Sequence, residues 1–186
     1  MKNLIALLTV SSLFLSGCTY DSFINKRDDG AFADVPNFSQ VNDGIFRGGR
    51  PSTPGVKKLK ERGIKTILSL RQDDNLNYVE KHISQQYGVN FLNFSLPDNK
   101  VPSDEQIAEF LRIVTNEKSY PIYVHCDLGT SQTNMLIAAY RVMVENWEVE
   151  KAYEEARKFY FSSPLPASEL KKFVYGLKRE EIAVLN

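Results

Sequence analysis

The sequence feature that most constrains the fold is a short apolar run that ends in a cysteine and is followed by a turn and a helix. The apolar residues 122–124 lead into His125 and Cys126, Gly129 follows, and a helical pattern begins near Gln132. A short apolar run bounded by turn residues predicts a buried strand. Ligands of parallel α/β sheets bind beyond the carboxyl ends of the strands. We therefore expect Cys126 to lie at a ligand site.

Strand patterns and helix patterns alternate along most of the remaining chain. Besides the run before Cys126, strands are expected over residues 44–47, 65–70 and 89–94. Helices are expected over 53–62, 75–87, 103–114, 132–145, 149–161 and 167–177, of which 103–114 has the clearest apolar periodicity. This alternation predicts an α/β fold with a central, mostly parallel sheet of four to five strands, flanked by helices.

The first residues of the chain differ from the rest. Lys2 precedes a short apolar run over residues 4–15, which is too brief to span a bilayer and predicts a secretory signal peptide over 1–17. The sequence at residues 15–18, Leu-Ser-Gly-Cys, resembles the lipobox of bacterial lipoproteins. That resemblance implies a lipidated Cys18 that anchors the protein to the membrane; a plain signal peptide with an accidental cysteine is the alternative.

Residues 18–35 are polar and aperiodic, and we interpret them as a tether between the lipid and a domain over 36–186. Thr19 follows the cysteine where an aspartate would suggest retention in the inner membrane. By resemblance to the sorting of enterobacterial lipoproteins, we expect the protein to be anchored in the outer membrane, facing the periplasm.

The net charge and the numbers of histidines and cysteines limit which ligands and partners can be expected. The formal net charge is zero, which gives no reason to expect nucleic acid as a partner. The chain has only two histidines, of which His82 lies in a polar segment and is expected on the surface, so no metal site or other cofactor is predicted. If Cys18 is lipidated, Cys126 has no partner for a disulfide within the chain.

The segment from Cys126 to the following helix is suited to bind an anion. Backbone N–H groups and the positive end of the helix dipole converge where a loop enters a helix N-terminus. A cysteine at that point would be held largely as the thiolate, which is the reactive form for attack on phosphorus. The alternative is a buried structural cysteine at the end of a strand.

The same loop, with several other segments, resembles the atypical dual-specificity and tyrosine phosphatases of bacteria and fungi. Their loop reads His-Cys-x5-Arg-Ser/Thr, and the likeness extends over about residues 37–180. Matching segments include 41–51, 63–71, 96–98, 138–141 and 146–147. The resemblance implies a cysteine-phosphatase fold whose partners are phosphorylated proteins or small phosphate esters.

Carried over to this chain, the family's roles fall on a few residues. Cys126 would attack phosphorus to form a thiophosphate intermediate, and His125 would orient it. Asp98 would protonate the leaving oxygen, although it could instead be a turn residue without a catalytic role. Asp104 is a weaker candidate for the proton donor. Phosphate would be held by the loop residues Asp127, Leu128, Gly129, Thr130, Ser131, Gln132 and Thr133, with the Thr133 hydroxyl near the thiolate.

The loop departs from the family at its arginine. Gln132 stands six residues after Cys126, in the arginine position, and no arginine occurs between Cys126 and Arg141. Ser131 and Asn134 stand where many bacterial relatives have aspartate and glycine. A guanidinium grips two phosphate oxygens with charge-assisted bonds, whereas an amide offers a neutral donor.

Two hypotheses follow. The protein is a phosphatase with weakened catalysis, or it is a pseudophosphatase that binds phosphorylated or other anionic ligands without turnover. An arginine from elsewhere in the chain would favour the first, and Arg47, Arg50 and Arg71 are the candidates, although a surface or structural role is the favoured alternative for each. Another thiol chemistry and a purely structural envelope lipoprotein are the remaining alternatives.

Overall fold

A central sheet of five strands organises the computed structural model, which describes residues 34–98, 100–161 and 163–178. The order across the sheet is β1 (Ser39–Gln40), β2 (Ile45–Gly48), β5 (Ile122–His125), β3 (Thr66–Ser69) and β4 (Asn90–Asn93). All neighbours are parallel except β1 and β2. This arrangement confirms the predicted fold class. The predicted signal peptide and the lipidated Cys18 lie outside the described residues.

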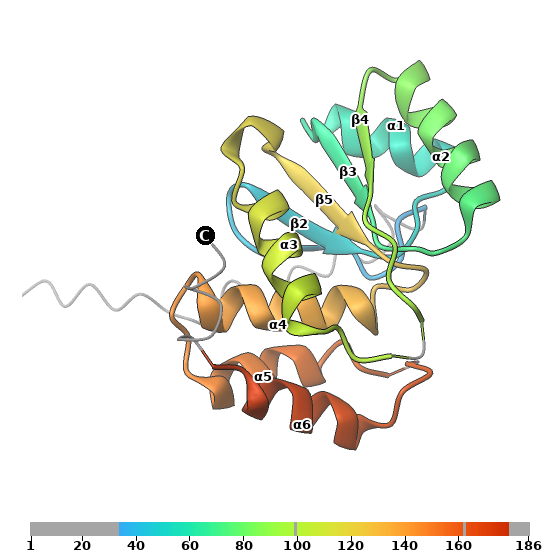
Figure 1. Cartoon of the computed structure of the whole chain (residues 1–186). Coiled ribbons are helices and arrows are strands. Elements are labelled where there is room, and N and C mark those ends of the chain that lie inside the picture. Colours follow the sequence, from blue (N-terminus) through green and yellow to red (C-terminus); the bar gives the residue numbers. More distant parts are fainter. Residues whose placement is uncertain (1–33, 99, 162, 179–186) are drawn as a thin grey trace, which may run out of the picture.

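Helices cover both faces of the sheet (Figure 1). One face carries α1 (Thr53–Glu61) and α2 (Asp74–Gln86). The other carries α3 (Asp104–Val114), α4 (Gln132–Met143), α5 (Val149–Arg157) and α6 (Ala167–Gly176), and a 3-10 turn spans Glu117–Ser119. The apolar core is accordingly split into two clusters, one on each side of the sheet.

Local sequence explains where several helices begin. The Ser103 side chain accepts from the Gln106 N–H, and the Gln106 side chain accepts from the Ser103 N–H, which is the capping box that the sequence predicts before α3. The Ser52 hydroxyl caps α1, and Pro54 occupies its first turn. By contrast, α4 has no side-chain cap, so its first N–H groups are not consumed by its own N-cap residue.

The helix α4 is the central element of the larger core. Its residues from Gln132 through Val142 are all buried. It contacts α3, α5 and α6, and it begins directly behind the loop that follows β5. The position of that loop is therefore fixed by the best-packed helix of the domain.

The structure corrects several sequence expectations. The strand β1 was not predicted, because two residues carry no periodicity and its pairing depends on Phe46 and Arg47 of β2. The strand expected over residues 44–47 is β2, which spans Ile45–Gly48 and contains Arg47. The helix expected to reach residue 161 ends at Arg157. Over residues 34–98, 100–161 and 163–178, no helix has both the length and the apolar character needed to cross a membrane.

Candidate active site

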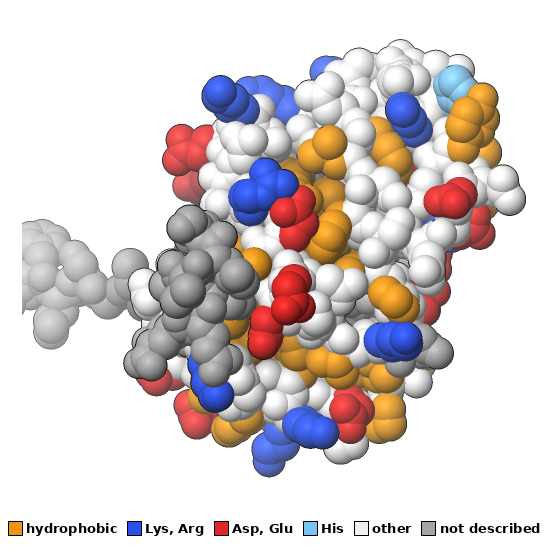
Figure 2. Space-filling view, in the orientation of Figure 1, with side chains coloured by type: hydrophobic (Ala, Val, Ile, Leu, Met, Phe, Trp, Pro, Cys, Tyr) orange, Lys and Arg blue, Asp and Glu red, His pale blue; other side chains and the backbone are white. Residues whose placement is uncertain are grey.

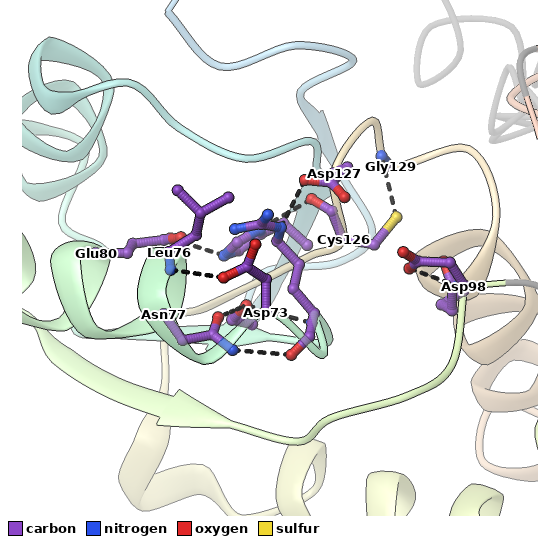
Figure 3. Close-up of polar contacts among 12 residues, drawn as sticks. Asp73, Leu76, Asn77, Glu80, Asp98, Cys126, Asp127 and Gly129 are labelled. Carbon is purple, nitrogen blue, oxygen red and sulfur yellow. Dashed lines mark hydrogen bonds and ion pairs between the residues drawn. The ribbon is translucent and has the colours of Figure 1, made fainter.

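Cys126 lies at the mouth of the β5–α4 loop, directly after the carboxyl end of β5. The residue is 3% exposed, and its Sγ accepts a hydrogen bond from the Gly129 N–H at 3.3 Å. Figure 3 shows this bond, with the sulfur turned toward the side on which Asp98 lies. The sulfur therefore lies at the start of the loop that leads into the N-terminus of α4.

Gly129 is required by the path of the loop. Its φ is +75°, and a Cβ built there would lie 2.5 Å from the backbone carbonyl carbon and oxygen of Gly48. Any L side chain would therefore be strained and would also collide with β2. The close approach of the loop to the end of β2 sets the curvature that brings the Gly129 N–H to the sulfur.

The Arg47 side chain is buried and donates hydrogen bonds to the backbone of the loop and to α4. The side chain is 2% exposed, donates to the Gly129 carbonyl at 2.8 Å and to Asn134 Oδ1 at 3.1 Å, and lies 4.1 Å from the centroid of the Phe159 ring. Burial lowers the pKa of Arg47 to about 10, so it stays protonated near neutral pH. Asn134, which replaces the glycine of many relatives, also donates to the Ala156 carbonyl at 2.7 Å. Of the predicted alternatives for Arg47, the structural one fits its contacts.

Arg71 pairs with an acidic residue of the loop. Its Nε lies 2.5 Å from Oδ1 of Asp127, and the two side chains are 5% and 53% exposed. The Arg71 carbonyl accepts from the side chains of Asn77 and Asn93, which fix the turn after β3. The positive charge of Arg71 is thus next to the loop but already balanced by Asp127. Arg50 is exposed and touches the loop only through its backbone N–H, which donates to the Asp127 carbonyl.

Gln132 joins the loop to the segment that carries Asp98. Its Nε2 donates to the Pro97 carbonyl at 3.0 Å and to Asp98 Oδ1 at 3.2 Å. The residue is 3% exposed. Gln132 therefore binds the candidate proton donor directly. Through Gln132, the segment that carries Asp98 is joined to the loop that follows Cys126.

Glu80 is a residue of this site that sequence reasoning missed. It lies on α2, is 4% exposed, and places Oε1 2.8 Å from Nε2 of His125. The other ring nitrogen of His125 lies 3.0 Å from the carbonyl oxygen of Cys126. The ring therefore faces the cysteine backbone, not its sulfur. Glu80 sits in a polar helix pattern, and no sequence signal distinguishes it from the solvated residues around it.

The remaining predicted residues divide into two groups. Thr130 and Ser131 are buried in the loop and Thr133 is buried in the first turn of α4, where its hydroxyl makes no hydrogen bond to the described residues. Leu128 is 46% exposed and contributes only backbone, since its carbonyl accepts from Asn37. Asp104 lies in the first turn of α3 and lines a different cavity, of about 280 Å³.

His82 lies on the surface, as the sequence predicts. His82 is exposed on α2, where its ring meets that of Tyr78 edge-on. In the part of the chain that the structure describes, no three His, Cys, Asp or Glu side chains gather as they would around a metal ion.

Comparison with known proteins supports a common family. Residues 31–172 match the model of a family described as "DSP-PTPase phosphatase fused to NAD+ Kinase". A probable tyrosine-protein phosphatase of Dictyostelium discoideum is 25% identical over 127 residues, covering 66% of this chain and 75% of its own. An inositol diphosphatase of Arabidopsis thaliana is 28% identical over 126 residues, but this chain spans only 61% of its length.

Solved structures share the fold. The catalytic domain of the PP-IP phosphatase SIW14 of S. cerevisiae, in complex with citrate, aligns with a TM-score of 0.68 at 28% identity, covering 81% of this chain and 91% of that one. TpbA of P. aeruginosa in complex with pTyr aligns with the same TM-score at 21% identity, covering 80% and 89%. At that identity the second likeness speaks for the fold alone.

Proposed function

Since the chain belongs to this family of dual-specificity and tyrosine phosphatases, we propose that it hydrolyses phosphate monoesters slowly through Cys126, with Asp98 as proton donor. The observation that carries the proposal is the hydrogen bond from Gln132 to Asp98. It joins the acid to the same loop whose Gly129 N–H donates to the cysteine sulfur. Two-step phosphoryl transfer needs a nucleophile and an acid at one site.

In the first step the Cys126 thiolate forms a bond to phosphorus while the bond to the leaving oxygen breaks. The carboxylic acid of Asp98 gives its proton to that oxygen and becomes the carboxylate. In the second step water attacks phosphorus and the sulfur–phosphorus bond breaks. Asp98 takes up the proton of the water, inorganic phosphate leaves, and the thiolate is restored.

The rate is expected to be low because the two buried arginines beside the loop, Arg47 and Arg71, already interact with other groups. Arg47 binds the Gly129 carbonyl, and Arg71 is balanced by Asp127. Loss of one preorganised donor typically costs about 10²–10³ in rate. The charge of the missing guanidinium adds to that loss, since negative charge is spread over the oxygens in the transition state.

A second candidate function is binding of phosphorylated or anionic groups without turnover. The pair between Arg71 and Asp127 favours it, because this acidic residue in the loop opposes the build-up of negative charge. The backbone N–H groups and the unconsumed N-terminus of α4 would still hold an oxyanion.

Hydrolysis of an aryl phosphate by the wild-type chain and by Cys126→Ser separates these functions. We expect slow turnover that the substitution abolishes, with both proteins retaining binding of inorganic phosphate. Binding by both proteins with no turnover in either would favour the pseudophosphatase. Equal turnover by both would rule out Cys126 as the nucleophile.

Two finer assignments complete the proposal. The substrate is proposed to be a phosphorylated protein or a small phosphate ester, supported by relatives named as tyrosine phosphatases and inositol diphosphatases. We also propose that Cys18 carries lipid and holds the protein at the periplasmic face of the outer membrane, supported by the sequence of residues 15–18. Mass spectrometry of the N-terminal peptide from a membrane fraction tests the lipid: an acylated Cys18 supports it, and a free thiol contradicts it.

A further inference from the structure

Glu80 is a buried acidic residue that pairs with His125. The carboxylate is on α2, 4% exposed, with Oε1 2.8 Å from Nε2 of a histidine that is itself 0% exposed. Neither oxygen of Glu80 makes any other contact of hydrogen-bond geometry with the described residues. Burying a carboxylate costs free energy unless its charge is compensated, so the pair with His125 needs an explanation.

The hydrogen positions on the His125 ring follow from its surroundings. Nδ1 lies 3.0 Å from the carbonyl oxygen of Cys126, which can only accept, so Nδ1 carries a hydrogen. One proton then remains for Nε2 and the carboxyl group of Glu80 to share. If Nε2 holds it, the ring is an imidazolium directly behind the nucleophilic residue, and Glu80 is its counter-ion.

The other groups around the ring favour this ion pair. The Tyr123 ring stacks on the imidazole at 5.7 Å between centroids and 17° between planes, and the face of an aromatic ring attracts a cation. Arg71 is balanced by Asp127. Arg47 lies within electrostatic reach of Glu155, which itself pairs with Arg141. The negative charges of Asp127 and Glu155 thus partly offset the two arginines, and Glu80 is the carboxylate in direct contact with His125.

Anchoring of α2 does not require a carboxylate at this position. One turn earlier, Asn77 ties the helix to the sheet with neutral bonds, donating to the Arg71 carbonyl at 2.9 Å and accepting from the Ser69 hydroxyl at 2.9 Å. A neutral side chain at position 80 would serve the same purpose. What Glu80 adds is its negative charge, at the nitrogen of His125 that points away from Cys126.

We propose that Glu80 is a positioning residue that keeps both ring nitrogens of His125 protonated and thereby favours the thiolate form of Cys126. It acts through His125 and does not touch the substrate. The proposal concerns the state of the thiol and not its turnover of phosphate, so it can fail or hold independently of the proposed function.

The first test is nitrogen NMR of the wild-type full chain labelled at histidine, followed across pH. The chain has two histidines, and the exposed His82 on the same helix serves as an internal reference. We expect the nitrogen signals of His125 to show a proton on both ring nitrogens at neutral pH. A His125 ring with one bare nitrogen at neutral pH would overturn the proposal. This measurement needs no variant and so does not depend on whether one folds.

The second test is the pH profile of Cys126 alkylation by iodoacetamide, read by mass spectrometry on the peptide that contains Cys126. Glu80→Gln keeps the shape and removes the charge, Glu80→Asp keeps the charge, and Glu61→Gln on α1 is a control with an exposed carboxylate. We expect Glu80→Gln to slow alkylation about tenfold below neutral pH, because loss of an opposite charge shifts such a titration by at least about one pH unit. Glu80→Asp should recover part of the rate, and Glu61→Gln should match the wild type. A Glu80→Gln profile that superimposes on the wild type contradicts the proposal.

Discussion

The side-chain amide of Gln132 donates a hydrogen bond to Oδ1 of Asp98, at 3.2 Å, and a second one to the Pro97 carbonyl, at 3.0 Å. The residue at the arginine position of the phosphate loop thus contacts the segment of the candidate acid. An amide in that role positions Asp98 without adding charge. In the proposed function, an amide at position 132 leaves the transferring phosphoryl group without a charged donor from this residue.

Restoring the arginine is expected to raise the rate. In Gln132→Arg the guanidinium can give two charge-assisted bonds to phosphoryl oxygens, and we expect kcat for an aryl phosphate to rise about 10- to 100-fold. Gln132→Lys supplies the charge without the planar fork and should raise kcat less. An unchanged kcat in both variants, with the fold intact by circular dichroism, would show that the missing cation does not limit the rate.

Removing the proton donor should affect substrates unequally. Asp98→Asn is expected to lower kcat about 10²-fold or more for an alkyl phosphate, whose leaving oxygen needs a proton. A nitrophenyl phosphate, with a more stable leaving anion, should lose much less. Asp104→Asn, in the first turn of α3, is the control and should leave both rates unchanged. If Asp98→Asn lowered both rates equally, Asp98 would not be the acid.

Removing the acidic residue of the loop should strengthen anion binding. In Asp127→Asn the Arg71 guanidinium loses its partner at 2.5 Å and becomes available to an oxyanion. We expect inorganic phosphate to inhibit this variant at a concentration several-fold lower than the wild type, with a steeper dependence on salt. Asp43→Asn makes the same substitution at another exposed aspartate and is the matched control.

The double variant Asp127→Asn with Arg71→Gln checks the cause of that effect. If Arg71 supplies the gain, the double variant returns to wild-type affinity or weaker. A gain that persists in the double variant would mean that removal of the negative charge alone explains it.

Substitution of the loop glycine should destabilise the fold. In Gly129→Ala the new Cβ would meet the Gly48 backbone at 2.5 Å and the residue would keep a positive φ, so we expect a loss of about 1–3 kcal/mol in the free energy of unfolding. Gly176→Ala is the control, because nothing lies within 4 Å of a Cβ built there. Urea denaturation of the two variants measures the difference, and equal stabilities would contradict the strain argument.

The sequence predicts those parts of the fold whose signals are local. The apolar run before Cys126 and the capping box at Ser103 each specify an element within a few residues, and the structure has both. β1 escaped prediction because its two residues are a strand only through pairing with β2. The ends of α5 likewise depend on packing rather than on periodicity.

The candidate site was predictable only along the loop itself. Cys126, Gly129 and Gln132 are adjacent in sequence, so their order already suggests a phosphate cradle. The partners that tune it come from distant elements: Glu80 from α2, and Arg71 from the turn after β3. Both occur among other charged residues, and only the folded sheet brings them to the loop.

Direct observation of the phosphorylated cysteine tests the central claim. The full chain is mixed with an aryl phosphate, quenched in acid within the first turnovers, and digested for mass spectrometry of the peptide that contains Cys126. We predict the added mass of one phosphoryl group on Cys126 of the wild type and none in Cys126→Ser. Release of phosphate by the wild type with no phosphoryl group ever found on Cys126 would contradict the account.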